Sequence, residues 1–273
     1  MGDFFLPAGI AVLVWWFTTG IILFLDGLPR HTFRRSMAGA TLVLVAAAFT
    51  LRASAGDASV AGAFSAFLSS VLIWGWLEMS FLMGFITGPR KVGCRENCGG
   101  WRHFLHATQA IIYNELATLA FAGLVAAATW RGANQVGLWT FLVLWTMRLS
   151  AKLNLFFGVP NTGENLLPAH LQYLKRFFRK KAMNPLFPVS ISASTAVAAM
   201  LIRKCLAAPP GFQSVGLALV ASLLALAVLE HWFMILPWNS EKLWNWGLKS
   251  HRVRVAPSIS PPLRQPLGVK SQR

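Results

Sequence analysis

Long apolar segments alternate with short polar ones along the first 248 residues of the chain. A helix needs about 20 mostly apolar residues to cross the hydrocarbon core of a bilayer. Runs close to this length occupy residues 4–25, 60–86, 107–130, 136–157, 185–206 and 215–236, and a shorter run occupies residues 37–53. The pattern predicts an all-α fold: a polytopic integral membrane helix bundle with about seven transmembrane helices.

The shorter run, 37–53, needs separate support because it barely reaches the length of a span. Basic residues provide that support, since Lys and Arg concentrate in the cytoplasmic loops of membrane proteins. With seven spans, 20 of the 25 basic residues fall on one side and 4 on the other, while Arg148 lies inside the fifth run. Without the second span, successive arginine-rich loops would alternate across the membrane. We therefore expect seven spans, an outside N-terminus and a cytoplasmic C-terminus.

Composition changes the meaning of the charge. The chain has 273 residues, of which 55% are hydrophobic and 12% charged, and its net charge is +16. In a soluble protein such a charge would suggest nucleic acid as a partner. Because the hydropathy excludes a soluble fold, we expect the lipid bilayer as the partner and no nucleic acid. Three cysteines also exclude a disulfide-rich scaffold.

We expect residues 1–248 to form a single transmembrane domain with one interfacial segment. Near 168–181, Leu171, Leu174 and Phe178 recur at helical spacing among basic residues, which predicts an interfacial amphipathic helix. A membrane-surface anchor is the favoured interpretation, and docking of an acidic partner or anionic lipid is the alternative. The basic residues of this anchor are Lys175, Arg176, Arg179, Lys180 and Lys181. Residues 249–273 are basic and proline-rich, and we expect a disordered cytoplasmic tail.

Ionisable residues occur within four predicted spans, where an isolated charge is costly. Counted from the cytoplasmic ends of the helices at ~1.5 Å per residue, they share a depth of about 10–14 Å. We therefore predict an intramembrane polar cluster that joins helices three, four, five and seven. Its residues are Glu78, Glu115, Arg148, Lys152, Asn154, Glu230 and His231. Ion pairs that lock the helices are the favoured interpretation; a proton or substrate site and a pigment-handling surface are the alternatives.

His231 is the candidate pigment ligand of this set. A neutral imidazole can bind the magnesium of a chlorin, and the small Ala227 four residues earlier leaves room on the same helix face for a flat macrocycle. A structural histidine, hydrogen-bonded to Glu230 or to a neighbouring helix, is the favoured interpretation because this spacing is common by chance.

Small residues are frequent in the first half of the third run, at 61–63, 65–66 and 69–70. In lipid, small residues let helix backbones approach each other closely. The third run therefore has a face suited to close packing, either against a helix of a partner protein or against a neighbour in this chain.

One predicted loop carries a possible set of metal ligands, namely Cys94, Cys98, His103 and His106. Their spacing differs from that of standard zinc sites, so we expect two reduced cytoplasmic thiols and no metal. The sequence also lacks the short motifs of nucleotide-binding proteins, serine hydrolases and zinc proteases. We expect no enzyme activity and assign no catalytic residues.

Seven sequence blocks carry a resemblance to a known family. They are LVWWFTTG (13–20), WGWLE (74–78), ITGP (86–89), RLSAKLN (148–154), FGVP (157–160), NPLFP (184–188) and EHWFMILP (230–237). In these blocks, from about residue 13 to residue 248, the chain resembles the PuhE family, known as photosynthetic complex assembly protein 2. The resemblance implies a multi-pass protein of the inner membrane, cytoplasmic or intracytoplasmic, of purple-type phototrophic bacteria. It implies a role in assembling the reaction centre and core light-harvesting antenna, with an influence on bacteriochlorophyll supply, and it transfers no catalytic residues.

The functional expectation is thus an assembly factor whose partners are reaction-centre or light-harvesting subunits, with no certain cofactor. Two alternatives stay open: a carrier that binds bacteriochlorophyll or a precursor through His231, and an intramembrane enzyme or proton-coupled transporter that uses Glu78, Glu115 and Glu230. The segment 113–115 reads Tyr-Asn-Glu where the family is expected to have Tyr-His-Glu. This departure argues against an indispensable pigment-binding histidine at position 114.

Overall fold

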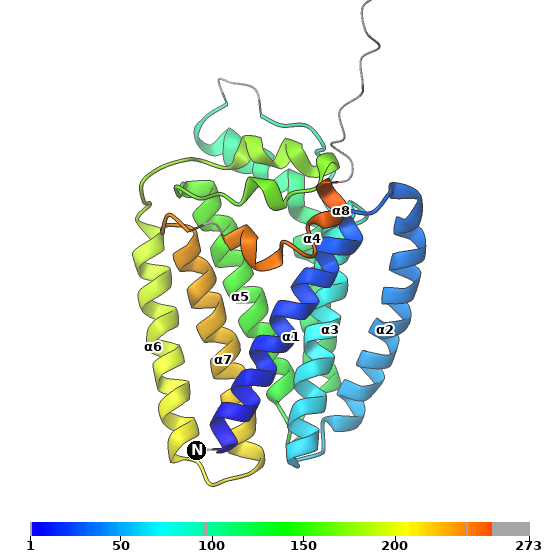
Figure 1. Ribbon diagram of the computed structural model, residues 1–273, viewed down its shortest axis with the longest axis vertical. Coiled ribbons are helices and arrows are strands. Elements are labelled where there is room, and N and C mark those ends of the chain that lie inside the picture. Colours follow the sequence, from blue (N-terminus) through cyan, green and yellow to red (C-terminus); the bar gives the residue numbers. More distant parts are fainter. Residues whose placement is uncertain (1, 95–97, 239, 253–273) are drawn as a thin grey trace, which may run out of the picture.

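Seven long helices dominate the computed structural model, which describes residues 2–94, 98–238 and 240–252. Within these ranges the fold is all-α, as predicted, and no strand is present. The long helices are α1 (Gly2–Asp26), α2 (Phe33–Ser54), α3 (Val60–Leu82), α4 (Gly100–Ala128), α5 (Val136–Phe157), α6 (Leu186–Ala207) and α7 (Phe212–Phe233) (Figure 1). Short helices lie between and after them: η1 (Arg30–Thr32), η2 (Glu164–Leu166), η3 (Ala169–Phe177) and η4 (Ser240–Trp244), which are 3-10 helices, and α8 (Lys249–Arg252).

Six of these helices are long and apolar enough to cross a membrane, and they are α1, α2, α3, α4, α6 and α7. The helix α5 has 22 residues but carries Arg148 and Lys152, which lower its hydropathy. It packs against α3, α4, α6 and α7 within the bundle. The described residues therefore contain six candidate membrane-spanning helices, while the seventh span and the orientation of the termini stay predictions.

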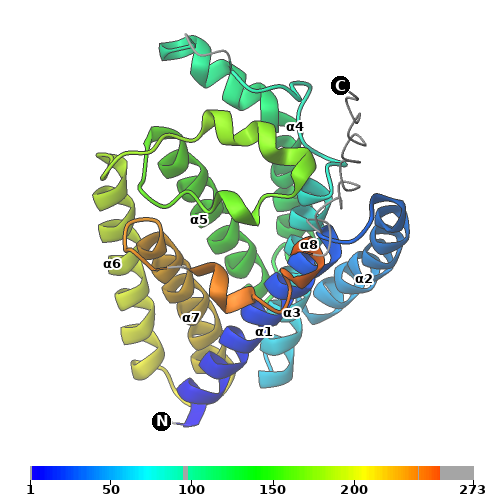
Figure 2. The ribbon, with the colours of Figure 1, turned by 45° about the horizontal axis from the view of Figure 1, so that its top comes forward.

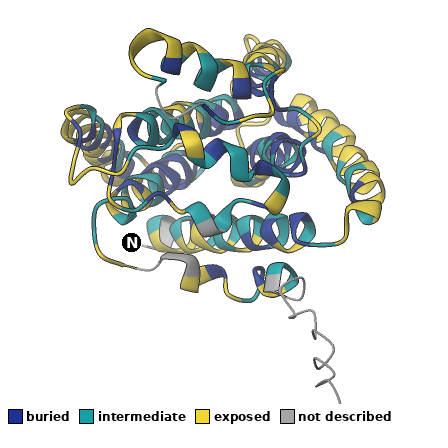
Figure 3. Cartoon of the chain, turned by 90° about the horizontal axis from the view of Figure 1, so that it is seen from above, coloured by how far each residue is buried: buried dark blue, intermediate teal, exposed yellow. Residues whose placement is uncertain are grey.

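The centre of the bundle is α3, which contacts α1, α2, α4, α5 and α7. Its small residues Ala63 and Ala66 are completely buried. Nearby, the Ser70 hydroxyl donates to the carbonyl of Gly137 in α5 over 2.8 Å. A Cβ on Gly137 would lie only 3.2 Å from the carbonyl oxygen of Ala66, so the two backbones approach closely. The small-residue face thus packs within this chain, whereas α2 at the edge of the bundle is largely exposed (Figure 3).

Two helices, α3 and α7, end three or more residues earlier than the hydropathy predicts. The run 60–86 is helical only to Leu82, because Gly84 adopts φ +81° and the N–H groups of Phe85 and Ile86 both bond to the carbonyl of Ser80. The helix α7 ends at Phe233 rather than at residue 236. There the Asn161 side chain donates to the carbonyl of Phe233 over 3.1 Å, which satisfies a group at the helix end.

The connection between α5 and α6 covers one end of the bundle (Figure 2), and we call this segment, residues 158–185, the roof. The expected α-helix near 168–181 is instead a 3-10 helix over Ala169–Phe177. A 3-10 helix repeats every three residues, so it buries Leu171, Leu174 and Phe177 rather than the predicted Phe178. These side chains pack with Phe81 of α3 in a small core. The apolar face of the segment therefore contacts protein, which corrects the expected α-helix with an apolar face turned to lipid, while an anchoring role of its basic residues at the membrane surface stays a prediction.

The N-terminus lies at the opposite end of the bundle from the roof and α8 (Figure 1). Residues 249–252, predicted as the start of a disordered tail, form the helix α8 instead. The reason is a contact with α1, in which the Nε2 atom of His251 lies 2.7 Å from Oδ1 of Asp26. The rest of the predicted tail, 253–273, lies outside the described residues.

Candidate functional site

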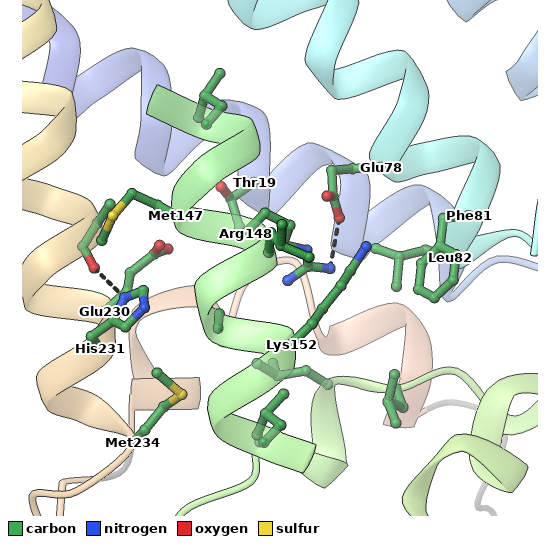
Figure 4. Close-up of a pocket in the computed structure, with 18 of the residues that line it drawn as sticks. Thr19, Glu78, Phe81, Leu82, Met147, Arg148, Lys152, Glu230, His231 and Met234 are labelled. Carbon is green, nitrogen blue, oxygen red and sulfur yellow. Dashed lines mark hydrogen bonds and ion pairs between the residues drawn. The ribbon is translucent and has the colours of Figure 1, made fainter. Parts of the chain in front are cut away.

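A cavity of about 600 Å³ lies between α1, α3, α4, α5 and α7, directly beneath the roof. Most of its wall is apolar, with large side chains such as Trp15, Phe67 and Trp74. The ionisable residues in the wall are Glu78, Glu115, Arg148, Lys152, Glu230 and His231. Six of the seven residues predicted as one polar cluster thus line one cavity, and Figure 4 shows the arrangement of several of them.

The first ion pair of the cavity joins α5 to α3. The Nη2 atom of Arg148 lies 2.7 Å from Oε2 of Glu78, and the two side chains are 39% and 16% exposed. The contact is drawn as a dashed line in Figure 4. A carboxylate and a guanidinium inside a membrane bundle reduce each other's cost of burial, so the pair explains how both charges are accommodated.

The second ion pair joins α5 to α4. The Nζ atom of Lys152 lies 2.6 Å from Oε1 of Glu115 and 5.4 Å from the ring centre of Phe81. Arg148 and Lys152 are four residues apart and share one face of α5. That face therefore holds two carboxylates from two different helices.

The third carboxylate has a different partner. The indole Nε1 of Trp15 in α1 donates to Oε1 of Glu230 in α7 over 3.1 Å. Within the described residues, no cationic group lies within ion-pair distance of Glu230. Trp15 belongs to the block 13–20 in the middle of α1, and its contact with the carboxylate was not predicted because an indole within an apolar run gives no sign of a polar partner on another helix.

His231 bonds to other partners than Glu230, although the two are neighbours in sequence. Its Nδ1 atom lies 2.8 Å from the carbonyl oxygen of Ala227, and its Nε2 atom lies 2.9 Å from Oγ of Ser150 in α5. A carbonyl can only accept a hydrogen bond, so Nδ1 carries the proton and the Ser150 hydroxyl donates to Nε2. The side chain is only 2% exposed and links α7 to α5.

Asn154 does not line the cavity with the other predicted residues. It is fully buried, and its Nδ2 atom donates to the carbonyl of Ser150 over 3.0 Å. Asn184 donates to Oδ1 of Asn154 over 3.1 Å and to the carbonyl of Gly158 over 2.9 Å. The other end of the Asn184 amide, Oδ1, accepts from the backbone N–H groups of Leu186 and Phe187 at the start of α6.

The predicted cluster therefore divides into two groups on two faces of α5, while Glu230 bonds separately to Trp15 of α1. We call Glu78, Glu115, Arg148 and Lys152 the charged face, and Ser150, Asn154, Asn184 and His231 the neutral network. Sequence reasoning missed Ser150 and Asn184. Ser150 lies in the block 148–154 and Asn184 in the block 184–188. A hydroxyl or amide side chain at these positions does not indicate a buried polar contact in the way that a charge within an apolar run does.

The block 86–89 shapes the α4 wall of the cavity. The N–H of Asn114 bonds to the carbonyl of Thr87 over 3.0 Å, and the N–H of Arg90 bonds to the carbonyl of Gln109 over 3.3 Å. A Cβ on Gly88 would lie 2.1 Å from the carbonyl oxygen of Gln109. Only glycine allows this approach, so the segment fits into α4 just before Glu115.

The predicted metal ligands separate into a group of three and an outlier. Cys94 and Cys98 are joined as a disulfide, which corrects the expectation of two reduced thiols. The Nδ1 atom of His106 lies 3.3 Å from Sγ of Cys94 and 3.2 Å from Sγ of Cys98. His103 lies elsewhere, with its ring centre 5.3 Å from that of Phe156.

The basic residues of the roof differ in their contacts. The Nζ atom of Lys180 lies 2.9 Å from Oε1 of Glu164, and the guanidinium of Arg179 lies 5.4 Å from the ring centre of Phe156. The Thr162 hydroxyl and Lys180 hold the pKa of Glu164 below its ordinary value through hydrogen bonds. Arg176 and Lys181 are exposed and Lys175 is half-buried, so the roof presents several cations on its outer surface.

Comparisons with known proteins identify the family. Residues 1–254 match the family described as "Protein of unknown function (DUF3623)". A protein of Rhodobacter capsulatus, described as "Uncharacterized 30.4 kDa protein in puhA 5'region", is 40% identical over 256 residues, which cover 92% of this chain and 93% of the relative. No solved structure matches. By its match over nearly the whole described length, the chain belongs to the DUF3623 family.

Proposed function

We propose that the protein is a membrane-embedded assembly factor for the bacterial photosynthetic reaction centre and core antenna complex. The observation that carries the proposal is the relative from Rhodobacter capsulatus, whose description places its gene in the 5' region of puhA. This location indicates a photosynthesis-related role. The identity of 40% over 92% of the chain supports extending that role here, and the PuhE-like blocks give it its specific form.

The proposed orientation places the roof in the cytoplasm and α5 as the seventh span. All connections rich in basic residues then share the cytoplasmic side, as the positive-inside rule requires. The buried polar groups of α5 are compatible with a span because the neighbouring helices α3, α4 and α7 supply Glu78, Glu115 and His231 as their partners. The membrane is the bacterial inner membrane, either cytoplasmic or intracytoplasmic.

In this function the protein holds subunits rather than transforming a substrate. Reaction-centre or light-harvesting subunits would bind laterally to exposed helix faces, of which α2 is the most open. Exposed cations of the roof, such as Arg176 and Lys181, would attract acidic segments of the same subunits. The proposal includes no catalytic step and no enzyme activity.

Co-purification from phototrophically grown cells tests the assembly role. The full chain carries an affinity tag, the membranes are solubilised in mild detergent, and a tagged multi-pass protein of another function is the control. We expect reaction-centre or light-harvesting polypeptides with this protein and not with the control. Absence of these polypeptides, together with normal complexes in a deletion strain, would exclude the assembly role.

Carriage of bacteriochlorophyll or a precursor is a second candidate function, favoured by the cavity. A volume of about 600 Å³ falls within the range of sites for small organic ligands, which is roughly 300–1,000 Å³. Because His231 keeps its proton on Nδ1, its Nε2 atom is the one suited to bind magnesium. The fit requires a rearrangement, since the Ser150 hydroxyl now bonds to Nε2 and the ring is 2% exposed.

Two substitutions test the carrier function in protein incubated with bacteriochlorophyll. His231→Ala should abolish binding if Nε2 is the ligand. Ser150→Ala removes the competing hydroxyl and should then strengthen binding, because the imidazole no longer has to give up a hydrogen bond. Equal chlorin absorption in the wild type and in His231→Ala would contradict ligation by His231.

A further inference from the structure

Three potential metal ligands outside the cavity converge between the α3–α4 loop and α4. The two sulfurs of Cys94 and Cys98 and the Nδ1 atom of His106 all lie within 4.8 Å of one another. Cys94 is buried, while Cys98 and His106 are half-buried. From the geometry we infer that the dithiol form of this group is a Zn²⁺ site, with the Cys94–Cys98 disulfide as its oxidised state.

The local structure explains why these residues, and not all four candidates, form the group. Cys98 lies just before Gly99, the N-cap of α4, and His106 lies in the second turn of the helix. His103 is three residues earlier on the helix and is held between the rings of Phe156 and Phe177, with ring-centre distances of 5.3 and 5.7 Å. The helix therefore presents one imidazole to the sulfurs and the other to the aromatic core.

The chemistry of the three ligands fits zinc. Zinc is commonly bound by cysteine thiolates and histidine nitrogens in tetrahedral geometry. Binding would release the two thiol protons of Cys94 and Cys98 and leave their sulfurs as thiolates. The His106 Nδ1 atom already faces both sulfurs, so it would supply the nitrogen ligand with its lone pair.

The proposed orientation favours the dithiol form of the pair. The α3–α4 loop would face the cytoplasm, where glutathione and thioredoxin keep protein thiols reduced. The three protein ligands among the described residues leave one tetrahedral position for a water molecule or another donor. Cys94 packs with Leu171 and Leu174 of the roof, so a bound ion would fasten the α3–α4 loop beside the roof.

Zinc content of the purified full-length protein tests the inference. The protein is prepared in detergent with a phosphine reductant, equilibrated with zinc chloride, freed of excess metal and measured by mass spectrometry. We expect one zinc ion per chain in the wild type and loss of the bound ion in Cys94→Ser, Cys98→Ser and His106→Ala. His103→Ala is the matched control and should keep the ion. Zinc-free wild type under these conditions, or full zinc content in His106→Ala, would overturn the inference.

A second measurement needs no variant and therefore does not depend on the folding of the mutants. Zinc-bound thiolates react slowly with alkylating reagents, whereas unbound thiols react at their usual rate. In reduced wild-type protein, zinc should protect two cysteines from iodoacetamide, identified as Cys94 and Cys98 by peptide mapping, and a chelator should remove the protection. Equal alkylation with and without zinc would also reject the site.

Discussion

The two faces of α5 accommodate polar side chains inside the bundle in different ways. On the charged face, Arg148 and Lys152 pair with carboxylates across a cavity, and the four side chains are 16–39% exposed. In the neutral network, Asn154, Asn184 and His231 are at most 2% exposed. Hydrogen bonds between uncharged groups join Asn184 to Asn154 and His231 to Ser150. The difference follows from solvation, because neutral groups can be satisfied fully by hydrogen bonds, whereas full burial of an ion pair costs several kcal/mol per charge.

This difference suggests a division of roles. The neutral network joins α5, α6 and α7 through buried hydrogen bonds that hold the helices together, and of its members His231 also borders the cavity. The charged face borders the cavity, where a ligand or a protein segment could contact Arg148 directly. Three substitutions, ordered from the largest expected effect to the smallest, test whether the two faces differ in this way, and a fourth, in the roof, has the smallest expected effect.

Asn184→Ala should cause the largest loss of stability. The substitution removes the partners of Asn154, of the Gly158 carbonyl and of two N–H groups at the start of α6. Unsatisfied buried groups cost about 1–3 kcal/mol each and a lost helix cap about 1 kcal/mol. We expect a decrease of about 3 kcal/mol in the free energy of unfolding, measured by thermal denaturation in detergent.

Ser190→Ala is the control for Asn184→Ala. The Ser190 hydroxyl lies 3.4 Å from Nδ2 of Asn154 and bonds mainly to the carbonyl of Leu186 in its own helix. Its loss should cost well under 1 kcal/mol. Equal effects of the two substitutions would show that the neutral network does not depend on Asn184.

Gly88→Ala should weaken the support of the charged face. The added Cβ would meet the carbonyl oxygen of Gln109 at 2.1 Å, so the 86–89 segment must move away from α4 and from Glu115. We expect a loss of about 2 kcal/mol in the free energy of unfolding. Gly75→Ala in α3 is the matched control, since its Cβ would meet only Ile22 at 3.8 Å, and it should stabilise the helix by about 0.5–1 kcal/mol.

Glu115→Gln separates a structural ion pair from a catalytic or transporting carboxylate. The substitution leaves Lys152 without its counter-charge and should cost about 1–2 kcal/mol, since the pair is partly exposed. The double variant Glu115→Gln, Lys152→Met should recover most of this loss. A folded, abundant single variant that fails to support complex assembly would instead favour a proton-coupled role for the carboxylates.

Glu164 should give the smallest effect, limited to the roof. Hydrogen bonds from Thr162 and Lys180 lower the pKa of Glu164, so its contribution is present above the ordinary carboxyl pKa and is lost as the pH falls through the lowered value. Because Lys180 is 67% exposed, the contribution is under about 1 kcal/mol. The stability difference between wild type and Glu164→Gln should shrink on acidification, and a constant difference would contradict the assignment.

The hydropathy of the sequence predicted the long helices. A segment in lipid must satisfy its backbone hydrogen bonds internally, as a helix does, and must present apolar side chains to the lipid. The polar cluster was predicted as one group that included all of the charged residues and, of the neutral network, only Asn154 and His231. A charge in an apolar run is conspicuous, so Glu78, Glu115, Arg148 and Lys152 were found. Serine and asparagine are common in many settings, so the roles of Ser150 and Asn184 were visible only once α5, α6 and α7 were placed together.

The spacing of apolar residues also gave a wrong prediction for the conformation of the roof. The spacing of Leu171, Leu174 and Phe178 suits an α-helix on a membrane surface, yet the segment is a 3-10 helix that buries Phe177 against the bundle. A short segment of this kind takes its conformation from the surface it covers, since isolated helices of this length are not stable by themselves. The same reasoning applies to α8, which contacts α1 through His251 and Asp26.

The sequence by itself predicted the all-α class, the long apolar helices and the charged residues that line the cavity. Segment length, hydropathy and charge can be read without knowing which residues are in contact. Only the tertiary structure decided that the polar residues divide between ion pairs at a cavity and a network of neutral hydrogen bonds. It also decided that Cys94, Cys98 and His106 converge without His103. These outcomes depend on which side of each helix meets its neighbour, and that is settled by packing between segments far apart in the chain.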